Sequence, residues 1–160
     1  MARDANPRAV ILSEYQKPEY RIEETDLTFE IAEGSTEVRS RLRLRRAPGT
    51  APGTALRLDG QGLSLVSIAV DGVPLGSNQY RVDEDSLTVF DLPEQAEVAL
   101  VTRICPEDNA ALEGLYKSGG MYCTQCEAEG FRRITYYQDR PDVLARFTTT
   151  IVADAERYPV

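Results

Sequence analysis

The sequence predicts an all-β domain, built as an antiparallel β-sandwich or a saddle-like curved sheet. Apolar and polar residues alternate along most of the first two-thirds of the chain, which is the two-residue period of a half-buried strand. Turn sequences such as Asp71-Gly72 separate these runs at intervals of roughly ten residues, as is typical of sandwiches and curved sheets. A length of 160 residues fits one domain with a sizeable core.

The first two predicted strands form an antiparallel hairpin. Leu27, Phe29 and Ile31 alternate with polar residues, and the alternation resumes from 38 to 44 after a turn at 33–35. The second run carries arginines between its apolar residues. We expect these arginines to line the solvent-facing side of a strand rather than to bind a partner: Arg39, Arg41, Arg43, Arg45 and Arg46.

Further short strands are predicted at 56–58, 63–70, 80–82, 87–89 and 98–104, with Asp71-Gly72 as a hairpin turn. The character of the sequence changes after Pro106. Residues 109–116 predict a helical turn ended by Gly119-Gly120, residues 131–137 a strand, and Pro141 a short turn. A last strand is predicted at 147–152. We expect it to have an open edge, at which copies of the chain exchange strands into a homo-oligomer.

Charge and composition exclude several classes of protein. A net charge of −8 argues against a nucleic-acid partner, because duplex binding needs a basic face. The longest apolar runs, such as 98–101, are too short for a membrane span, and the apolar stretch 9–12 is too short for a signal peptide. Three cysteines without a secretion signal fit reduced thiols, so a cytoplasmic location is expected.

The chain contains no histidine, which removes the commonest general base and the commonest zinc ligand. Cys123 and Cys126 have the spacing of half a zinc site or of a redox pair, but Cys105 is the only further thiol. A redox pair is expected at a strand-to-helix junction, whereas this pattern is β throughout. Ordinary loop thiols are therefore favoured, and we expect no catalytic residue and no metal ligand in this chain.

Glu127 and Glu129 lie two residues apart, so on a strand both carboxylates face the same side. Such a pair serves acid–base chemistry, binds an ammonium group, or is simply exposed. An ion pair at 4 Å contributes about 1 kcal/mol in bulk water and about 4 kcal/mol in a partly shielded cleft. A carboxylate here therefore becomes a useful amine anchor only if something covers it.

The segments Ala111-Leu-Glu-Gly-Leu-Tyr116, Cys123-Thr-Gln-Cys-Glu-Ala-Glu-Gly-Phe131 and 139–147 closely resemble the N-terminal domain of bacterial aminopeptidase N, a zinc aminopeptidase of the gluzincin class. Residues 20–22, 26–29 and 56–58 also fit the start of that family, so the resemblance spans essentially the whole chain. It implies a non-catalytic domain of a zinc metallo-aminopeptidase of the membrane alanyl aminopeptidase type, which removes alanine, neutral and basic residues from peptide N-termini.

The resemblance also implies roles for two residues. Glu127 matches the acid that helps to bind the free α-amino group of the substrate, and Gln125 matches a neighbour that lines the first specificity pocket. The implied layout is an extension at 1–18, strands at 19–105, a substrate-binding loop region with strands at 106–147, and a last strand before a truncation at 148–160. The partners are the peptide's N-terminus and a catalytic domain of the same polypeptide.

The family's His-Glu-x-x-His zinc helix and its Gly-Ala-Met-Glu-Asn strand are absent from these residues. The resemblance therefore implies that the zinc cofactor belongs to the parent enzyme and that this chain alone is inert. Two other hypotheses come from different classes of protein. One is a stand-alone β-sandwich that binds proteins or ligands, and the other is a thiol oxidoreductase that uses Cys123 and Cys126.

Overall fold

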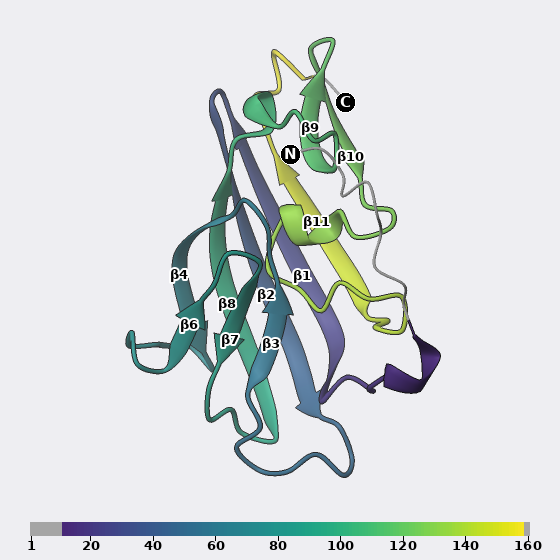
Figure 1. Ribbon diagram of the computed structural model, residues 1–160. Coiled ribbons are helices and arrows are strands. Elements are labelled where there is room, and N and C mark those ends of the chain that lie inside the picture. Colours follow the sequence, from purple (N-terminus) through teal and green to yellow (C-terminus); the bar gives the residue numbers. More distant parts are fainter. Residues whose placement is uncertain (1–10, 159–160) are drawn as a thin grey trace.

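The computed structural model describes residues 11–158, and within that range the chain is built from strands and three short 3₁₀ helices, with no α-helix. The large sheet contains β1 (Tyr20–Ala32), β2 (Ser35–Arg46), β4 (Ser64–Val70), β5 (Val73–Pro74), β8 (Gln95–Ile104) and β11 (Arg146–Val152). The smaller elements are β3 (Leu56–Asp59), β6 (Tyr80–Val82), β7 (Ser86–Val89), β9 (Gly114–Ser118), β10 (Met121–Gln125), η1 (Leu12–Glu14), η2 (Pro106–Asp108) and η3 (Phe131–Arg133). The all-β prediction is confirmed (Figure 1).

The large sheet has six strands in the order β11-β1-β2-β8-β4-β5. All its pairings are antiparallel except that of β1 with the edge strand β11, which is parallel. The hairpin predicted at 33–35 joins β1 to β2, and Asp71-Gly72 joins β4 to β5. These turns form where the sequence supplies glycine in a left-handed conformation, at Gly34 (φ 77°) and Gly72 (φ 78°).

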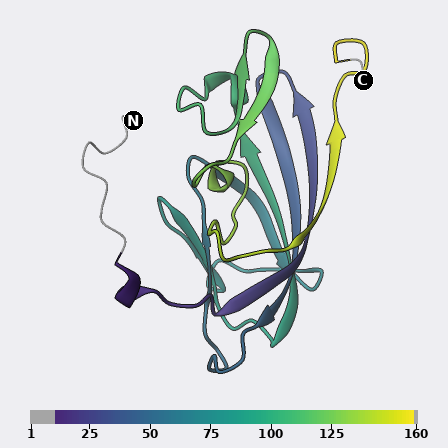
Figure 2. The ribbon, with the colours of Figure 1, turned by 90° about the vertical axis from the view of Figure 1, so that its right-hand side faces the viewer.

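Both small sheets lie on one face of the large sheet, its inner face (Figure 2). The three-stranded sheet β3-β7-β6 buries Leu56, Leu58, Leu87 and Val89 completely against residues of β2 and β8, and this forms the first of two core clusters. The β10-β9 hairpin contributes to the second cluster at the other end of the sheet, where Leu115 packs with Leu27 and Phe29. Burial of alternate residues on one face explains the period-two pattern of these strands.

The outer face of the large sheet is a ladder of charged side chains. Arginines of β2 pair with acids of the neighbouring strands: Arg39 with Glu30 at 3.0 Å, and Arg43 with Glu97 at 3.3 Å and with Glu24. Arg39 and Arg43 are about half exposed, so the prediction that these arginines face solvent is confirmed. Exposed pairs of this kind contribute about 0–1 kcal/mol each.

Two predictions for the last third of the chain are wrong. Residues 131–137 are not a strand: they form η3 and an irregular segment in which residues 134–138 are all buried. Residues 109–116 are not a helical turn: a turn at 110–111 leads into β9, and the side-chain amide of Asn109 donates to the carbonyls of Glu113 (2.7 Å) and Leu115 (2.8 Å). Gly119-Gly120 is the turn of the β9–β10 hairpin.

The turn at Pro141 and the strand after it are confirmed, although β11 begins at Arg146. All seven residues of β11 are exposed, and its far edge has no neighbouring strand within the described part of the chain. The predicted extension at 1–18 lies outside the described residues up to residue 10. No helix between residues 11 and 158 is long and apolar enough to cross a membrane.

Candidate functional site

The two site residues predicted from the sequence lie two positions apart in the chain at the end of β10. Gln125 is the last residue of that strand, and Glu127 is the first residue of the turn at 127–130. Both are exposed, and the side-chain Nε2 of Gln125 donates to the main-chain carbonyl of Glu127 at 3.2 Å. The Glu127 carboxylate forms no hydrogen bond or ion pair with any residue that the structure describes. The structure therefore leaves this negative charge free to meet a ligand.

The base of this turn is closed by close packing of main-chain atoms. The peptide bond between Glu127 and Ala128 is cis, and the amide of Gly130 donates to the carbonyl of Cys126 at 2.9 Å. A Cβ atom on Gly130 would lie 2.3 Å from the carbonyl oxygen of Gln125 and 3.1 Å from the amide nitrogen of Gly114. Only glycine allows the end of β10, the start of β9 and the end of the turn to meet this closely.

The segment after the turn is fixed by an ion pair that is mostly hidden from water. Arg132 donates to Asp139 Oδ2 from both Nε and its main-chain amide, each at 3.1 Å, and its Nη2 donates to the Asp139 carbonyl at 3.0 Å. The two side chains are 15% and 12% exposed. In turn the amide of Asp139 donates to Asp59 Oδ2 of β3 at 3.2 Å. These contacts connect the site turn to the three-stranded sheet.

Cys126, next to the turn, does not have the environment of a reactive thiol. Burial raises the pKa of Cys126, and the charge of Asp139 raises it further. A catalytic thiol needs the opposite shift, because the thiolate is the nucleophile. Cys105, Cys123 and Cys126 are all free thiols, and the raised pKa of Cys126 weighs against the oxidoreductase hypothesis.

The chemistry that this site offers is recognition of a cation by oxygen acceptors. It contains a carboxylate, a side-chain amide and main-chain carbonyls, but no imidazole, since the chain has no histidine. Between residues 11 and 158, no group of three or more cysteine, aspartate and glutamate side chains is arranged to hold a metal ion. The described residues therefore do not fit a zinc ion, and no catalytic step is assigned to them.

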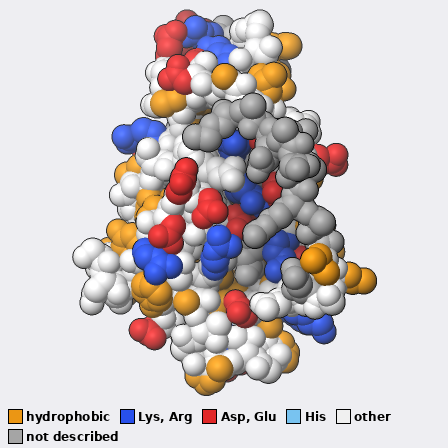
Figure 3. Space-filling model, viewed as in Figure 1, with side chains coloured by type: hydrophobic (Ala, Val, Ile, Leu, Met, Phe, Trp, Pro, Cys, Tyr) orange, Lys and Arg blue, Asp and Glu red, His pale blue; other side chains and the backbone are white. Residues whose placement is uncertain are grey.

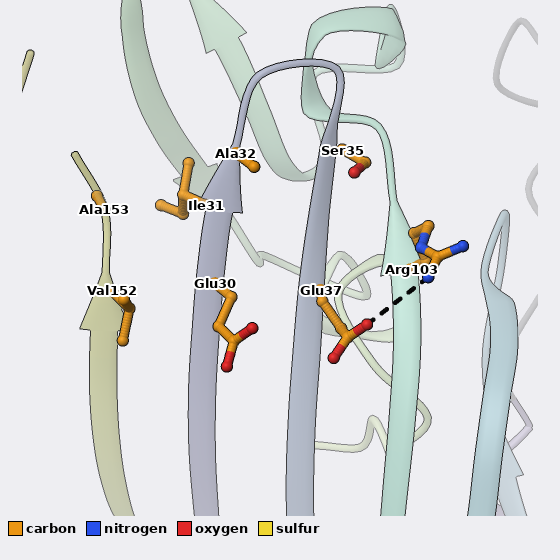
Figure 4. A pocket seen from close by; sticks show the side chains of 8 residues that line it. All are labelled: Glu30, Ile31, Ala32, Ser35, Glu37, Arg103, Val152 and Ala153. Atoms are coloured by element: carbon orange, nitrogen blue, oxygen red, sulfur yellow. Dashed lines mark ion pairs between the residues drawn. The ribbon is translucent and has the colours of Figure 1, made fainter.

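A hollow of about 400 Å³ lies across the outer face of β11, β1, β2 and β8 (Figure 4). Its two carboxylates are already paired: Glu30 with Arg39 at 3.0 Å, and Glu37 with Arg39 at 2.9 Å and Arg103 at 3.7 Å. Across the face seen in Figure 3, acidic and basic side chains are interspersed rather than gathered by sign. The hollow across the outer face therefore provides no unpaired carboxylate like that of Glu127.

The sequence did not reveal the anchoring role of Arg132 and Asp139. Charges of alternating sign, as at 132, 133, 139, 140 and 142, most simply predict exposed surface pairs, whereas the side chains of Arg132 and Asp139 are mostly buried. The signal that could have identified them is their position. They lie two residues outside the run 134–137, which is rich in aromatic and β-branched residues, so opposite charges stand near the two ends of the segment that the structure buries.

Comparisons with known proteins agree with this architecture. The model of the Peptidase M1 N-terminal domain matches residues 19–160. Over 154 residues the chain is 46% identical to aminopeptidase N of Escherichia coli and 46% identical to aminopeptidase N of Caulobacter vibrioides, covering 96% of this chain in both cases. The chain spans 17% and 18% of the length of these two relatives.

Solved structures give the same result at the level of the fold. Legionella pneumophila aminopeptidase A, solved in complex with aspartic acid, superposes with a TM-score of 0.86 at 32% identity, covering 93% of this chain and 18% of that one. An M1 zinc metallopeptidase of Deinococcus radiodurans has a TM-score of 0.68 at 17% identity, covering 83% and 32%, and so shows the shared fold alone. The chain belongs to the Peptidase M1 N-terminal domain family.

Proposed function

We propose that this chain is the non-catalytic N-terminal domain of a zinc aminopeptidase, and that Glu127 binds the α-amino group of the peptide substrate. The observation that carries the proposal is the free, exposed carboxylate of Glu127 on an anchored turn, in a chain 46% identical to two aminopeptidases N. The zinc ion and the groups that hydrolyse the peptide bond are assigned to a catalytic domain of the same polypeptide, outside this sequence.

The physical basis is recognition of an ammonium by a carboxylate. An exopeptidase must bind a free N-terminus, and a singly charged acid without an internal partner can do so without first breaking another bond. The interaction at 4 Å strengthens from about 1 kcal/mol in bulk water to about 4 kcal/mol when it is partly shielded. Glu127 is exposed in this domain, so a second domain has to cover it.

Gln125 is proposed as a neighbour that lines the first specificity pocket. Its Nε2 is occupied by the Glu127 carbonyl, which directs the side chain along the turn. This arrangement leaves its Oε1 as an acceptor for a substrate N–H. The preference for alanine, neutral and basic N-terminal residues is part of the same proposal, as is a cytoplasmic location, which the three unpaired thiols support.

The test is Glu127→Gln in the full-length enzyme, because this change removes the charge and keeps the shape. We expect kcat/KM for L-alanine p-nitroanilide to fall by about 30-fold to 1,000-fold, which corresponds to a shielded ion pair of about 2–4 kcal/mol. The matched control is Glu129→Gln, two residues away, whose carboxylate is 70% exposed and lies 3.5 Å from Arg132. A Glu127→Gln enzyme with the kinetics of the parent enzyme would refute the amine-anchor role.

A further inference from the structure

The ion pair between Arg132 and Asp139 differs from the other ion pairs near it. Its side chains are 15% and 12% exposed, whereas Arg140 and Asp142, one residue further along on the same segment, are 35% and 29% exposed. An ion pair shielded from water is stronger, and breaking it leaves an unpaired charge in the interior. The position of this pair is therefore restrained more tightly than a surface pair would be.

The three hydrogen bonds of this pair close the chain between residues 132 and 139 into one rigid unit. That unit is attached to β3, because the amide of Asp139 donates to Asp59 Oδ2 and the main chains of Asp59 and Tyr137 exchange hydrogen bonds of 2.7 and 3.0 Å. It is also attached to the end of β3 by the amide of Gln61, which donates to the Arg132 carbonyl at 2.9 Å. Residue 132 is thus fixed relative to the three-stranded sheet.

The turn that carries Glu127 has little freedom between its two ends. It begins at Gln125, which β10 holds, and it ends at Gly130, which is packed against Gln125 and Gly114 and leads directly into η3. A displacement of η3 therefore has to move residues 126–129. Because the Glu127 carboxylate has no partner of its own among the described residues, its position depends on this support.

We propose that Arg132 and Asp139 are positioning residues, which hold the turn so that the Glu127 carboxylate meets the substrate's ammonium group. This inference rests on the proposed function of Glu127. Neither residue touches the substrate. Their effect passes through the distance between the carboxylate and the ammonium, and a misplacement of about 1 Å is enough to weaken such a contact substantially.

The first arm of the test uses the full-length enzyme and a double-mutant cycle. Asp139→Asn keeps the shape and removes the charge, and we expect it to raise KM for L-alanine p-nitroanilide about tenfold with kcat within about threefold. Once Glu127→Gln has removed the charge that attracts the ammonium group, a displacement of the turn should change KM little further. Asp139→Asn should then raise KM by less than about twofold in the Glu127→Gln background. A full tenfold effect in both backgrounds would overturn the inference, since it would show that Asp139 acts independently of Glu127.

The second arm measures the turn itself by amide hydrogen exchange in this chain. In Asp139→Asn we expect the amides of Gly130 and Arg132 to exchange at least about tenfold faster, while amides of β2 and β8 keep their rates. The matched control is Asp142→Asn, which removes the more exposed neighbouring pair and should leave the turn unchanged. Unchanged exchange at Gly130 and Arg132 in Asp139→Asn would overturn the inference.

A second variant covers the case in which Asp139→Asn fails to fold. Arg132→Lys keeps the positive charge but loses the guanidinium group that donates to both Oδ2 and the main-chain carbonyl of Asp139, so it should give the same pattern with a smaller amplitude.

The two proposals can also fail separately. Faster exchange in the turn, together with a Glu127→Gln enzyme of normal KM, would overturn the amine-anchor function while the anchoring of the turn by Asp139 would stand.

Discussion

Gly130 offers the sharpest test of how the site turn is packed. Its φ of −84° and ψ of −17° lie in the right-handed region that any residue adopts, so its glycine is not required by backbone angles. What requires glycine is space: an added Cβ would lie 2.3 Å from the Gln125 carbonyl oxygen, 3.0 Å from Cys126 Cα and 3.1 Å from the Gly114 nitrogen. All three are main-chain atoms, so no side chain can rotate to relieve the clash.

The magnitude follows from that geometry. Ordinary contact begins near 3.4 Å, so main-chain atoms have to move by roughly 1 Å in Gly130→Ala. Overpacking lowers the free energy of unfolding by about 1–3 kcal/mol, and a clash with main-chain atoms that cannot rotate away lies at the upper end of this range. Alanine also restricts the unfolded chain, which raises the free energy of unfolding by about 0.4–1 kcal/mol. We therefore expect a net loss of about 2 kcal/mol in the free energy of unfolding, and a Tm lower by about 4–8 °C.

The assay is urea unfolding followed by circular dichroism, with Gly76→Ala as the matched control. Gly76 also has no positive φ, but its added Cβ would meet only side-chain ends, Asn78 Oδ1 at 3.2 Å and Gln79 Oε1 at 3.6 Å. We expect that variant to lie within about 0.5 kcal/mol of the parent chain. If Gly130→Ala is as stable as Gly76→Ala at an unchanged m-value, the close packing of the turn is refuted.

Two further predictions concern the hairpin and the sheet edge. Burial, and the hydrogen bond that Tyr122 donates to Glu107 at 2.7 Å, raise the pKa of Tyr122 above its usual 10.0, so the unfolded chain loses this proton first as pH rises. The stability that Tyr122 contributes should therefore be fully present below pH 10 and be lost above it. Urea unfolding between about pH 8 and 11 should show a steeper fall in the free energy of unfolding for the parent chain than for Tyr122→Phe. Parallel curves for the two proteins would contradict this. At the free edge of β11, two copies could pair antiparallel about Thr149, which would place Phe147 opposite the partner copy's Ile151 and bring no like charges together. We therefore expect a fraction of dimer that increases with protein concentration and is lost in Ile151→Lys. Sedimentation velocity measures this, and a parent chain that stays monomeric at high concentration would contradict it.

The strands that could be predicted from the sequence are those with one buried and one solvated face. In β2 the buried residues Val38, Leu42 and Leu44 alternate with exposed arginines, and the same alternation marks β8. A slip of one residue would turn every arginine into the core, so the pattern fixes both the strand and its register. The hairpins followed because glycine-containing turns lie between such runs.

The segment 131–137 shows where this reasoning stops. Ile134, Thr135, Tyr136 and Tyr137 are all nearly fully buried, because the segment crosses the inner face of the large sheet and is covered from both sides. The Thr135 hydroxyl lies 3.2 Å from that of Ser40, whereas the buried Tyr137 hydroxyl has no hydrogen-bond partner among the described residues. Continuous burial removes the alternation that distinguishes a strand from an irregular segment.

The candidate site was only partly predictable for a similar reason. Gln125 and Glu127 were identified through the family resemblance, and residue types alone gave exposed glutamates as the default. Their support is made of contacts between residues that have no periodic relation, such as Arg132 with Asp139 and Asp139 with Asp59, 80 residues away in the chain. Contacts of this kind depend on how the small sheet is placed on the large one, which no local pattern encodes.

Under the proposed function, the arrangement of this support also explains why Glu127 needs cover from a second domain. The turn is already ordered by Gly130 and by the buried pair of Arg132 and Asp139, so binding an ammonium has little conformational entropy left to overcome. The Glu127 carboxylate has no bond within the described domain that binding would have to break. The remaining determinant of affinity is water, which screens an exposed carboxylate and weakens its attraction for a cation about fourfold relative to a partly shielded site. If Glu127 binds the substrate's ammonium group as proposed, this domain orders and presents the charge, and a second surface has to exclude solvent from it.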